Sequence, residues 1–299
     1  KKLDVFIAPV SEQHRIVAKI EELFSDLDKG IESLKKAREQ LKIYRQAVLK
    51  HTFEGKLTEK WREENTDKIE TADQLLARIQ KEREARYQRQ LEKWNKDVKK
   101  WKGGGKEGVK PAKPKKFECI NPLSEEELSK LPLLPDGHIY TRLENLGELG
   151  RGKSKHRPRN DPQLFGGKYP FIQTAEVKAA NRIIQKHTQT YNETGLAQSK
   201  LWPEGTLCIT IAANIAETAF LGFDGCFPDS VVGFTAFENI VLPKYVELFI
   251  KAVRVRIEAY APATAQKNIN LTTLENLIVP VCSIEQQLYI VNEVEGIFS

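Results

Sequence analysis

The sequence predicts an α+β protein in which long, coiled-coil-type antiparallel helices are joined to a globular mixed α/β domain. Residues 12–50 carry apolar side chains at heptad-like spacing, which is typical of a long helix with a seam. Residues 102–132 hold glycines, prolines and many lysines. Residues 133–281 contain short β-rich runs separated by turn residues. We therefore expect helices first, then a linker, then a sheet domain.

The first helix is expected from residue 11 to about residue 50. Its apolar positions are three, four or seven residues apart, and Ser11 has a side chain suited to cap the helix start. The stripe is compatible with an amphipathic helix on a globular core, but its length favours a seam for a second helix. The predicted seam residues are Ile16, Ile20, Leu23, Leu27, Ile31, Leu34, Leu41 and Val48.

A second helical stretch is expected from Thr71 towards Trp101. Thr71 and Gln74 have the spacing of a capping box, and the triple glycine 103–105 ends the pattern. Residues 81–116 contain 14 Lys or Arg and 5 Asp or Glu, a net charge of +9, whereas the whole chain carries +6. The basic character is therefore concentrated in this helix and its linker.

The sheet domain is expected to cover residues 133–281, a length sufficient for its own core. One helix is predicted within it, at residues 244–260. The predicted strands are YPFIQ (169–173), GTLCITIA (205–212), AFLGF (219–223) and SVVGF (230–234).

Composition excludes several classes of protein. No apolar run approaches the ~20 residues that cross a bilayer, and the first residues lack the apolar region of a signal peptide. We expect no membrane association and a cytoplasmic protein. The four cysteines have no metal-ligand spacing and are expected to be reduced thiols. The absence of methionine indicates a fragment or a sequence that has lost residues.

An internal repeat is the most informative feature of the chain. IVAKIEELFS (16–25) aligns without a gap with IVNEVEGIFS (290–299), and IAPV (7–10) corresponds to IVPV (278–281). A strand end, a proline and the opening of a long helix are thus expected twice, once on each side of the sheet domain.

With these features the chain resembles the specificity subunit of type I restriction-modification systems. The resemblance is carried by residues 11–63, LGELGRGKS (146–154), YPFIQT (169–174), GTLCITIAANIAET (205–218) and YAPATAQKNINL (260–271). Such subunits have two target-recognition domains separated by two conserved helical regions. The resemblance implies the end of a preceding recognition domain at 1–10, a conserved spacer helix plus an inserted helical segment at 11–101, a basic linker at 102–132, a target-recognition domain at 133–281 and the start of a second conserved helix at 282–299.

Three departures from the family pattern matter. The stretch 64–116 is a long insertion, Ala175-Glu176 replaces a frequent Gly-Asp, and the second helix ends at Ser299. A single recognition domain with a short second helix leads us to expect that two copies can pair as a homodimer.

The densest basic cluster of the sheet domain is RGKSKHRPR (151–159). Its guanidinium groups can bind guanine edges bidentately and its lysines can neutralise phosphates, although a solvated charged turn is the alternative. The predicted DNA-binding residues here are Arg151, Lys153, Ser154, Lys155, His156, Arg157 and Arg159.

Two further segments carry amides and hydroxyls that can bind base edges. They can equally cap loops of the domain itself. Their predicted DNA-binding residues are Gln173, Thr174, Lys178 and Asn181 in the first segment, and Thr264, Gln266 and Lys267 in the second. The basic linker, with Trp94 and Trp101 nearby, could also track phosphates or stack on bases, but charge runs are usually solvated.

A catalytic interpretation finds little support. Asn160-Asp161-Pro162 lacks the second proline and the aromatic residue of an amino-methyltransferase motif, and no glycine-rich cofactor loop follows a strand. We expect a non-catalytic DNA-recognition subunit. The resemblance implies double-stranded DNA, methyltransferase subunits and restriction subunits as partners, with S-adenosylmethionine and ATP with Mg²⁺ bound by those subunits and no cofactor here. The alternatives are a stand-alone DNA adenine methyltransferase and a coiled-coil scaffold that binds protein.

Overall fold

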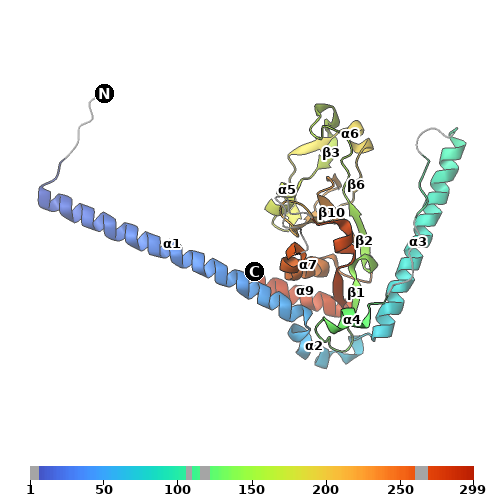
Figure 1. Cartoon of the computed structure of the whole chain (residues 1–299), viewed down its shortest axis with the longest axis horizontal. Coiled ribbons are helices and arrows are strands. Elements are labelled where there is room, and N and C mark those ends of the chain that lie inside the picture. Colours follow the sequence, from blue (N-terminus) through green and yellow to red (C-terminus); the bar gives the residue numbers. More distant parts are fainter. Residues whose placement is uncertain (1–6, 106–109, 115–121, 260–268) are drawn as a thin grey trace. The chain divides into compact units, whose positions relative to one another are not determined.

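Figure 1 shows the computed structural model of the chain. The structure describes residues 7–105, 110–114, 122–259 and 269–299. The chain divides into two compact units, Lys1–Val48 and Leu49–Ser299.

The helices and strands confirm the predicted α+β class. The α-helices are α1 (Val10–Phe53), α2 (Glu59–Glu64), α3 (Ala72–Gly103), α4 (Glu125–Ser129), α5 (Thr174–Ala179), α6 (Glu193–Ala197), α7 (Pro243–Ala259), α8 (Leu271–Glu275) and α9 (Ile284–Phe298). The strands are β1 (Ile139–Arg142), β2 (Gly147–Arg151), β3 (Phe165–Phe171), β4 (Ile183–Ile184), β5 (Gln189–Tyr191), β6 (Leu201–Trp202), β7 (Leu207–Thr210), β8 (Thr218–Leu221), β9 (Gly225–Cys226), β10 (Val231–Ala236) and β11 (Ile278–Val281). Four 3₁₀ turns are η1 (Lys56–Thr58), η2 (Thr66–Lys68), η3 (Leu143–Asn145) and η4 (Pro162–Leu164).

Helix α1 is a single helix of 44 residues, as the heptad-like stripe predicts. It begins earlier than expected, because the backbone N–H groups of Glu12 and Gln13 already donate to the carbonyl of Pro9. Ser11 therefore lies inside the first turn, and its prediction as the N-cap was wrong. The predicted seam from Ile16 to Leu41 is exposed, with no residue of the row less than 41% accessible, while Val48 is half-buried.

The internal repeat is visible in the hydrogen bonds that begin the two related helices. The Gln13 side-chain amide donates to the Ala8 carbonyl at 2.6 Å, and the Gln287 amide donates to the Cys282 carbonyl at 2.8 Å. Each contact spans five residues. The IVPV segment forms β11 by pairing with β1, whereas Ile7–Pro9 is not in a strand. The helix start is thus repeated, but the preceding strand forms only where it has a pairing partner.

The described part of the second unit contains three sheets. The largest has the strand order β2-β10-β7-β8-β4, antiparallel except for the parallel pair β8–β4. A four-stranded sheet has the order β5-β3-β9-β6, and β1 pairs with β11. The four predicted strand segments appear as β3, β7, β8 and β10, and the predicted helix appears as α7. The central strand β7 is buried at every position, which explains its unbroken apolar sequence.

The core of this unit is built from two larger apolar clusters. One packs α7 and α9 against the five-stranded sheet through residues such as Phe249, Val294 and Phe234. In the other, the rings of Trp202 and Phe227 stack with centroids 5.1 Å apart. Glycines at 150 and 233 make room for Trp202, because a Cβ at either position would lie within 2.9 Å of its ring. These two glycines are therefore required by the packing of the Trp202 ring.

Gly152, which directly follows β2, offers a test of this packing. An added Cβ would lie 2.3 Å from the carbonyl oxygens of both Phe227 and Pro228, so the backbone itself must move. We expect Gly152→Ala to lower the free energy of unfolding by about 2–3 kcal/mol. The same change at Gly296 in α9 meets nothing within 4 Å and should raise stability by up to about 1 kcal/mol. Urea denaturation of both variants measures the difference, and equal shifts would contradict the assigned packing.

His138 gives the second unit a pH-dependent stability. Its Nε2 lies 3.2 Å from the Gln286 amide nitrogen and its Nδ1 lies 3.3 Å from the Asp136 carbonyl, an arrangement that suits a neutral ring. Burial, assisted by Arg62, lowers the pKa of His138 below its ordinary value of 6.5. The unfolded chain therefore binds the proton first, so stability is lost as the pH falls below about 6.5.

We expect His138→Gln to flatten the pH dependence of the unfolding free energy between about pH 7 and pH 5. The unsubstituted chain, measured in the same way, is the reference for the slope. Chemical denaturation at half-unit pH intervals makes the comparison. An unchanged slope in the His138 variant would show that this ring does not control the dependence.

Candidate nucleic-acid interface

Strand register brings the described candidate segments to one end of the five-stranded sheet. Arg151 at the end of β2 pairs with Val232, and Thr210 at the end of β7 pairs with Val231. Strands β8 and β4 begin at the same end, and α5 precedes β4 and packs on β7 and β8. We call this the loop end of the sheet, comprising residues 151–161, 173–183, 211–217 and 228–230.

Asp229 fixes both ends of the basic cluster 151–159. The Arg159 guanidinium donates to its carboxylate at 2.8 Å, and the Arg151 guanidinium donates to its carbonyl oxygen. Asp229 lies in the turn before β10, which is the neighbour of β2 in the sheet. The cluster is therefore anchored to the sheet at its first and last arginines.

Side chains next to β6 hold the middle of the cluster. The Gln198 carbonyl oxygen accepts from the backbone N–H groups of Lys155 and His156 at 2.6 and 3.0 Å, and the Ser199 hydroxyl donates to the Lys153 carbonyl at 2.8 Å. Arg157 donates back to the carbonyls of residues 154 and 156, and Ser154 is buried. Because these bonds use backbone groups, the side chains of Lys153 and Lys155 stay exposed.

Asp161 has a local structural role. Its carboxylate accepts from the Gln163 backbone N–H at 3.0 Å, capping η4, and it lies 2.8 Å from His156 Nε2. The Gln163 N–H first, and the His156 ring second, lower the pKa of Asp161 below its ordinary value. The Asn-Asp-Pro sequence therefore serves to start a turn.

The second candidate segment is organised around α5. Glu176 accepts from the Gln173 backbone N–H at 3.1 Å and from the Thr188 hydroxyl at 2.6 Å. The Gln173 amide donates to Gln189 at 3.0 Å, and Lys178 donates to Asn214 in the β7–β8 turn at 3.0 Å. Glu176 thus completes the capping box at the start of α5. Thr174 opens α5 half-buried, and Asn181 is exposed.

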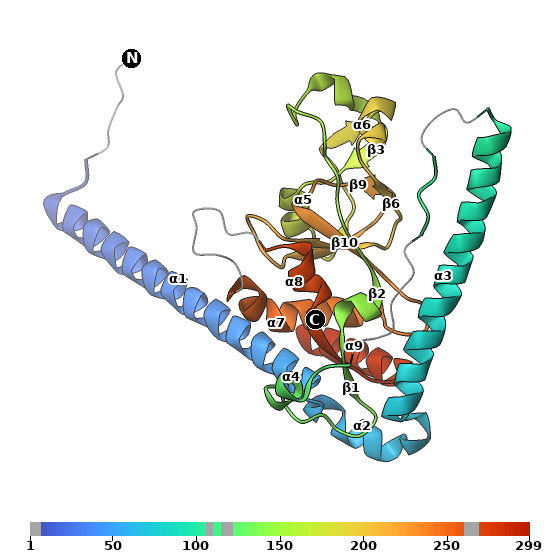
Figure 2. The same cartoon turned by 45° about the vertical axis from the view of Figure 1, so that its right-hand side comes forward.

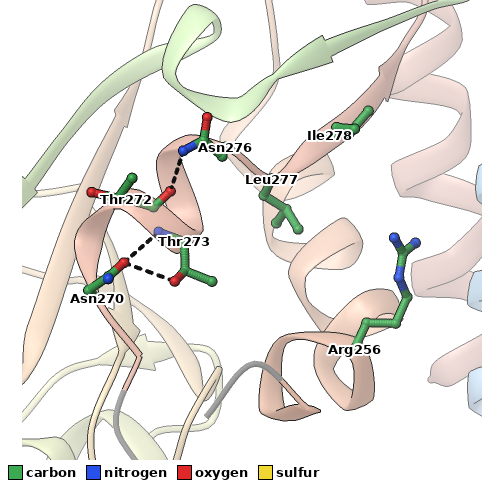
Figure 3. A pocket seen from close by; sticks show the side chains of 7 residues that line it. All are labelled: Arg256, Asn270, Thr272, Thr273, Asn276, Leu277 and Ile278. Atoms are coloured by element: carbon green, nitrogen blue, oxygen red, sulfur yellow. Dashed lines mark hydrogen bonds between the residues drawn. The ribbon is translucent and has the colours of Figure 1, made fainter. Parts of the chain in front are cut away.

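The third candidate segment, with Thr264, Gln266 and Lys267, lies outside the described residues. Ile269, which follows it, donates its N–H to the Ile211 carbonyl at 2.9 Å. A pocket of about 320 Å³ lies nearby, between the end of α7, α8 and the start of β11 (Figure 3). In it the Asn270 side-chain oxygen accepts from the Thr273 N–H and hydroxyl and so caps α8. Its lining is Arg256, Asn270, Thr272, Thr273, Asn276, Leu277 and Ile278.

Comparison with known proteins assigns the sheet domain to a protein family. A family model described as "Type I restriction modification DNA specificity domain" matches residues 140–295, which is slightly more than half of the chain. The chain belongs to this family. Specificity subunits of this family are non-catalytic DNA-recognition subunits.

Curated relatives agree with the family assignment. The type I restriction enzyme EcoDI specificity subunit of Escherichia coli is 38% identical over 80 residues, and the EcoKI specificity subunit of E. coli strain K12 is 37% identical over 84 residues. These matches cover 26% and 27% of this chain and 18% of each relative. The aligned part is thus under a fifth of the relatives' length.

A solved structure shows the same fold. Its description reads "Structural basis underlying complex assembly and conformational transition of the type I R-M system". One of its chains superposes on this chain with a TM-score of 0.59 at 15% sequence identity. The match covers 97% of this chain and 52% of that chain. The chain therefore spans about half the length of that structural neighbour.

Within the specificity domain, sequence reasoning missed the residues that order the loop end. Asp229, Gln198 and Asn214 each lie far along the chain from the segment they hold. No motif marks them, because an ordinary turn residue becomes important only when strand pairing places it beside a distant arginine. Among the described residues, no group of three or more His, Cys, Asp or Glu forms a metal site. No described helix has the length and apolarity to cross a membrane.

A partly buried ion-pair network supports the specificity domain beneath the loop end. Arg182, at positive φ before β4, donates to the fully buried Glu247 of α7 at 3.1 Å and to Glu295 of α9 at 2.5 Å. Lys251 also contacts Glu247, at 2.6 Å. The network ties the segment that carries Asn181 to two helices of the core.

Arg182 and Arg159 provide a matched pair of substitutions. Each binds a carboxylate, but Glu247 is fully buried whereas the Asp229 side chain is 33% exposed. We expect Arg182→Ala to cost about 2–3 kcal/mol of unfolding free energy, because a buried charge loses a partner, and Arg159→Ala to cost less than about 1 kcal/mol. Urea denaturation measures both. A cost at Arg159 equal to that at Arg182 would contradict the ranking by burial.

Proposed function

We propose that this chain reads one half of a bipartite DNA target as the recognition domain of a type I specificity subunit, without catalysing a reaction itself. The observation that carries the proposal is the convergence of the ordered basic cluster and the α5 segment at one end of a single sheet. Charged and amide side chains gathered on one surface suit a duplex, which presents phosphates and base edges together.

The contacts at the loop end suggest different roles for its residues. Lys153 and Lys155 are exposed and form no ion pair within the described chain, which suits phosphate neutralisation. Arg151, Arg157 and Arg159 use some of their donors to hold the loop, and the remaining donors can reach guanine. The exposed Asn181 suits adenine, which an amide binds bidentately.

The long helix suits a spacer between two reading domains. Helix α1 has 44 residues, and at 1.5 Å per residue it is about 66 Å long, more than one DNA turn. Its exposed apolar row supports packing against a partner helix, supplied in the proposal by a second copy of the chain. Methyltransferase and restriction subunits would dock on this assembly in the cytoplasm and supply the chemistry with S-adenosylmethionine, ATP and Mg²⁺.

The proposal is tested by selection from a random duplex pool at physiological salt, using the chain with the methyltransferase subunit encoded beside it. We expect enrichment of a short motif, and a spaced inverted pair would show that two copies read together. An unenriched pool that still retains DNA would contradict sequence reading. Failure to retain DNA at all would favour a scaffold that binds protein through α1.

Single substitutions separate phosphate contacts from base contacts in the enriched duplex. Lys155→Gln should weaken binding to all sequences and reduce the salt slope by about 1, whereas Asn181→Ala should cost about 1–3 kcal/mol and relax preference at one base pair. Lys60→Gln in α2, an exposed lysine outside the loop end, is the control and should change neither quantity. Fluorescence anisotropy across a salt series gives both readouts. A sequence-dependent loss in the Lys155 variant would reverse its assigned role.

A further inference from the structure

The contacts that fasten helix α3 to the sheet domain lie, among the described residues, in the first half of the helix. Leu75 and Ile79 are buried in the main core. One turn further, Arg83 donates to the Asn145 side chain, and Arg86 then forms a 2.6 Å ion pair with Glu148 of β2. These contacts fix the position of α3 against one edge of the sheet, since β2 is the first strand in the sheet order.

The order of these contacts gives the direction of α3. As α3 advances from residue 83 to residue 86, its partners advance from residue 145 to residue 148, so α3 and β2 run the same way. From Glu148, β2 continues about 10 Å to Arg151 at the loop end. From Arg86, α3 continues about 26 Å to Gly103. Figures 1 and 2 both show α3 rising on the β2 side of the sheet domain, and by these lengths its second half extends past the level of the loop end.

The face of α3 that packs on the domain becomes cationic where the contacts end. Steps of four and three residues along one helical face connect Leu75, Ile79, Glu82, Arg86, Arg89, Lys93, Lys96 and Lys100. Arg89 pairs with Glu82 at 2.5 Å. Lys93, Lys96 and Lys100 are exposed and form no ion pair with any described residue. We call these three residues the lysine row.

The aromatic face of α3 is already occupied. The Trp94 indole N–H donates to the Pro111 carbonyl at 3.0 Å, and the Lys113 ammonium lies 5.9 Å from the centre of the Trp94 ring. The returning segment 110–114 therefore lies against this face, and Trp94 is half-buried. Base stacking on Trp94 would compete with these contacts, whereas the side chains of the lysine row are exposed.

We propose that the lysine row binds the phosphate backbone of duplex DNA beside the target that the loop end reads. The row spans about 10 Å, and a DNA strand presents one phosphate per ~3.4 Å of helix axis, so three lysines match a short run of phosphates. The proposal rests on the proposed function, because the loop end defines which duplex lies beside α3. It adds a sequence-independent contact supplied by the helix inserted before the domain.

The test is the triple variant Lys93→Gln/Lys96→Gln/Lys100→Gln in the full chain, measured on a labelled random-sequence 40-base-pair duplex. Loss of three phosphate contacts should reduce the slope of log K against log salt by about 2–3 and weaken binding about 10- to 100-fold at physiological salt. Selection with the variant should still enrich the same motif as the parent chain. Glutamine keeps the helix propensity, and circular dichroism checks the helix content.

The matched control is Lys56→Gln/Lys60→Gln/Lys130→Gln, three exposed lysines near α2 and α4 that carry the same charge change. We expect the control to keep the salt slope of the parent chain. An equal slope for the parent and the lysine-row variant, with the motif still enriched, would overturn this inference alone. No duplex binding by the parent chain would overturn it together with the proposed function. A reduced slope in both triple variants would also overturn it, because net charge alone would explain the change.

Discussion

The pairing of β2 with β10 is the interaction on which the candidate interface depends. It places Arg151 beside the turn that precedes β10, so that Asp229 can hold both Arg151 and Arg159. Without this register the basic cluster would be a charged loop with many conformations, and ordering it on DNA would cost conformational entropy. Anchoring at both ends removes part of that cost before DNA arrives. The small residues Gly150 and Gly233 allow the pairing to coexist with the buried Trp202 ring.

Local sequence patterns predicted the elements well because their causes are local. The heptad-like spacing gave the span of α1, and the Thr71–Gln74 capping box gave the start of α3 within one residue. The apolar runs around residues 207–210 and 231–236 gave two central strands. Ser11 was misassigned because Pro9, two residues earlier, already accepts the first helical hydrogen bonds. A cap is chosen by backbone geometry, and several nearby residues can satisfy the sequence rule.

The candidate site could be predicted only as separate segments. The sequence identified the basic cluster and the α5 segment, but which of their side chains are already engaged depends on strand order. Lys178 reaches Asn214 only because the β7–β8 turn lies under α5, and Gln173 reaches Gln189 across the start of β5. For α3, the sequence predicted the helix but not its alignment with β2. That alignment follows from the contacts of Arg83 and Arg86 with Asn145 and Glu148, which lie far along the chain. Charge composition located the basic region without showing which face it occupies.

A spacer can set the distance between two reading surfaces only if each surface is rigidly joined to its helix. In the second unit, hydrogen bonds and ion pairs join α9 to the sheet domain. Gln287 of α9 accepts from the Leu242 N–H at 2.8 Å and donates to the Ile240 and Cys282 carbonyls, all in the buried core. Arg182 adds a link from the loop-end segment to Glu247 and Glu295. Rotation of α9 against the sheet would therefore break buried hydrogen bonds and leave the Glu247 carboxylate with fewer partners. The free-energy cost of these losses exceeds what new contacts at the surface would contribute. The loop end and the start of this helix are consequently held together, which is the mechanical property that the proposed half-site spacing requires.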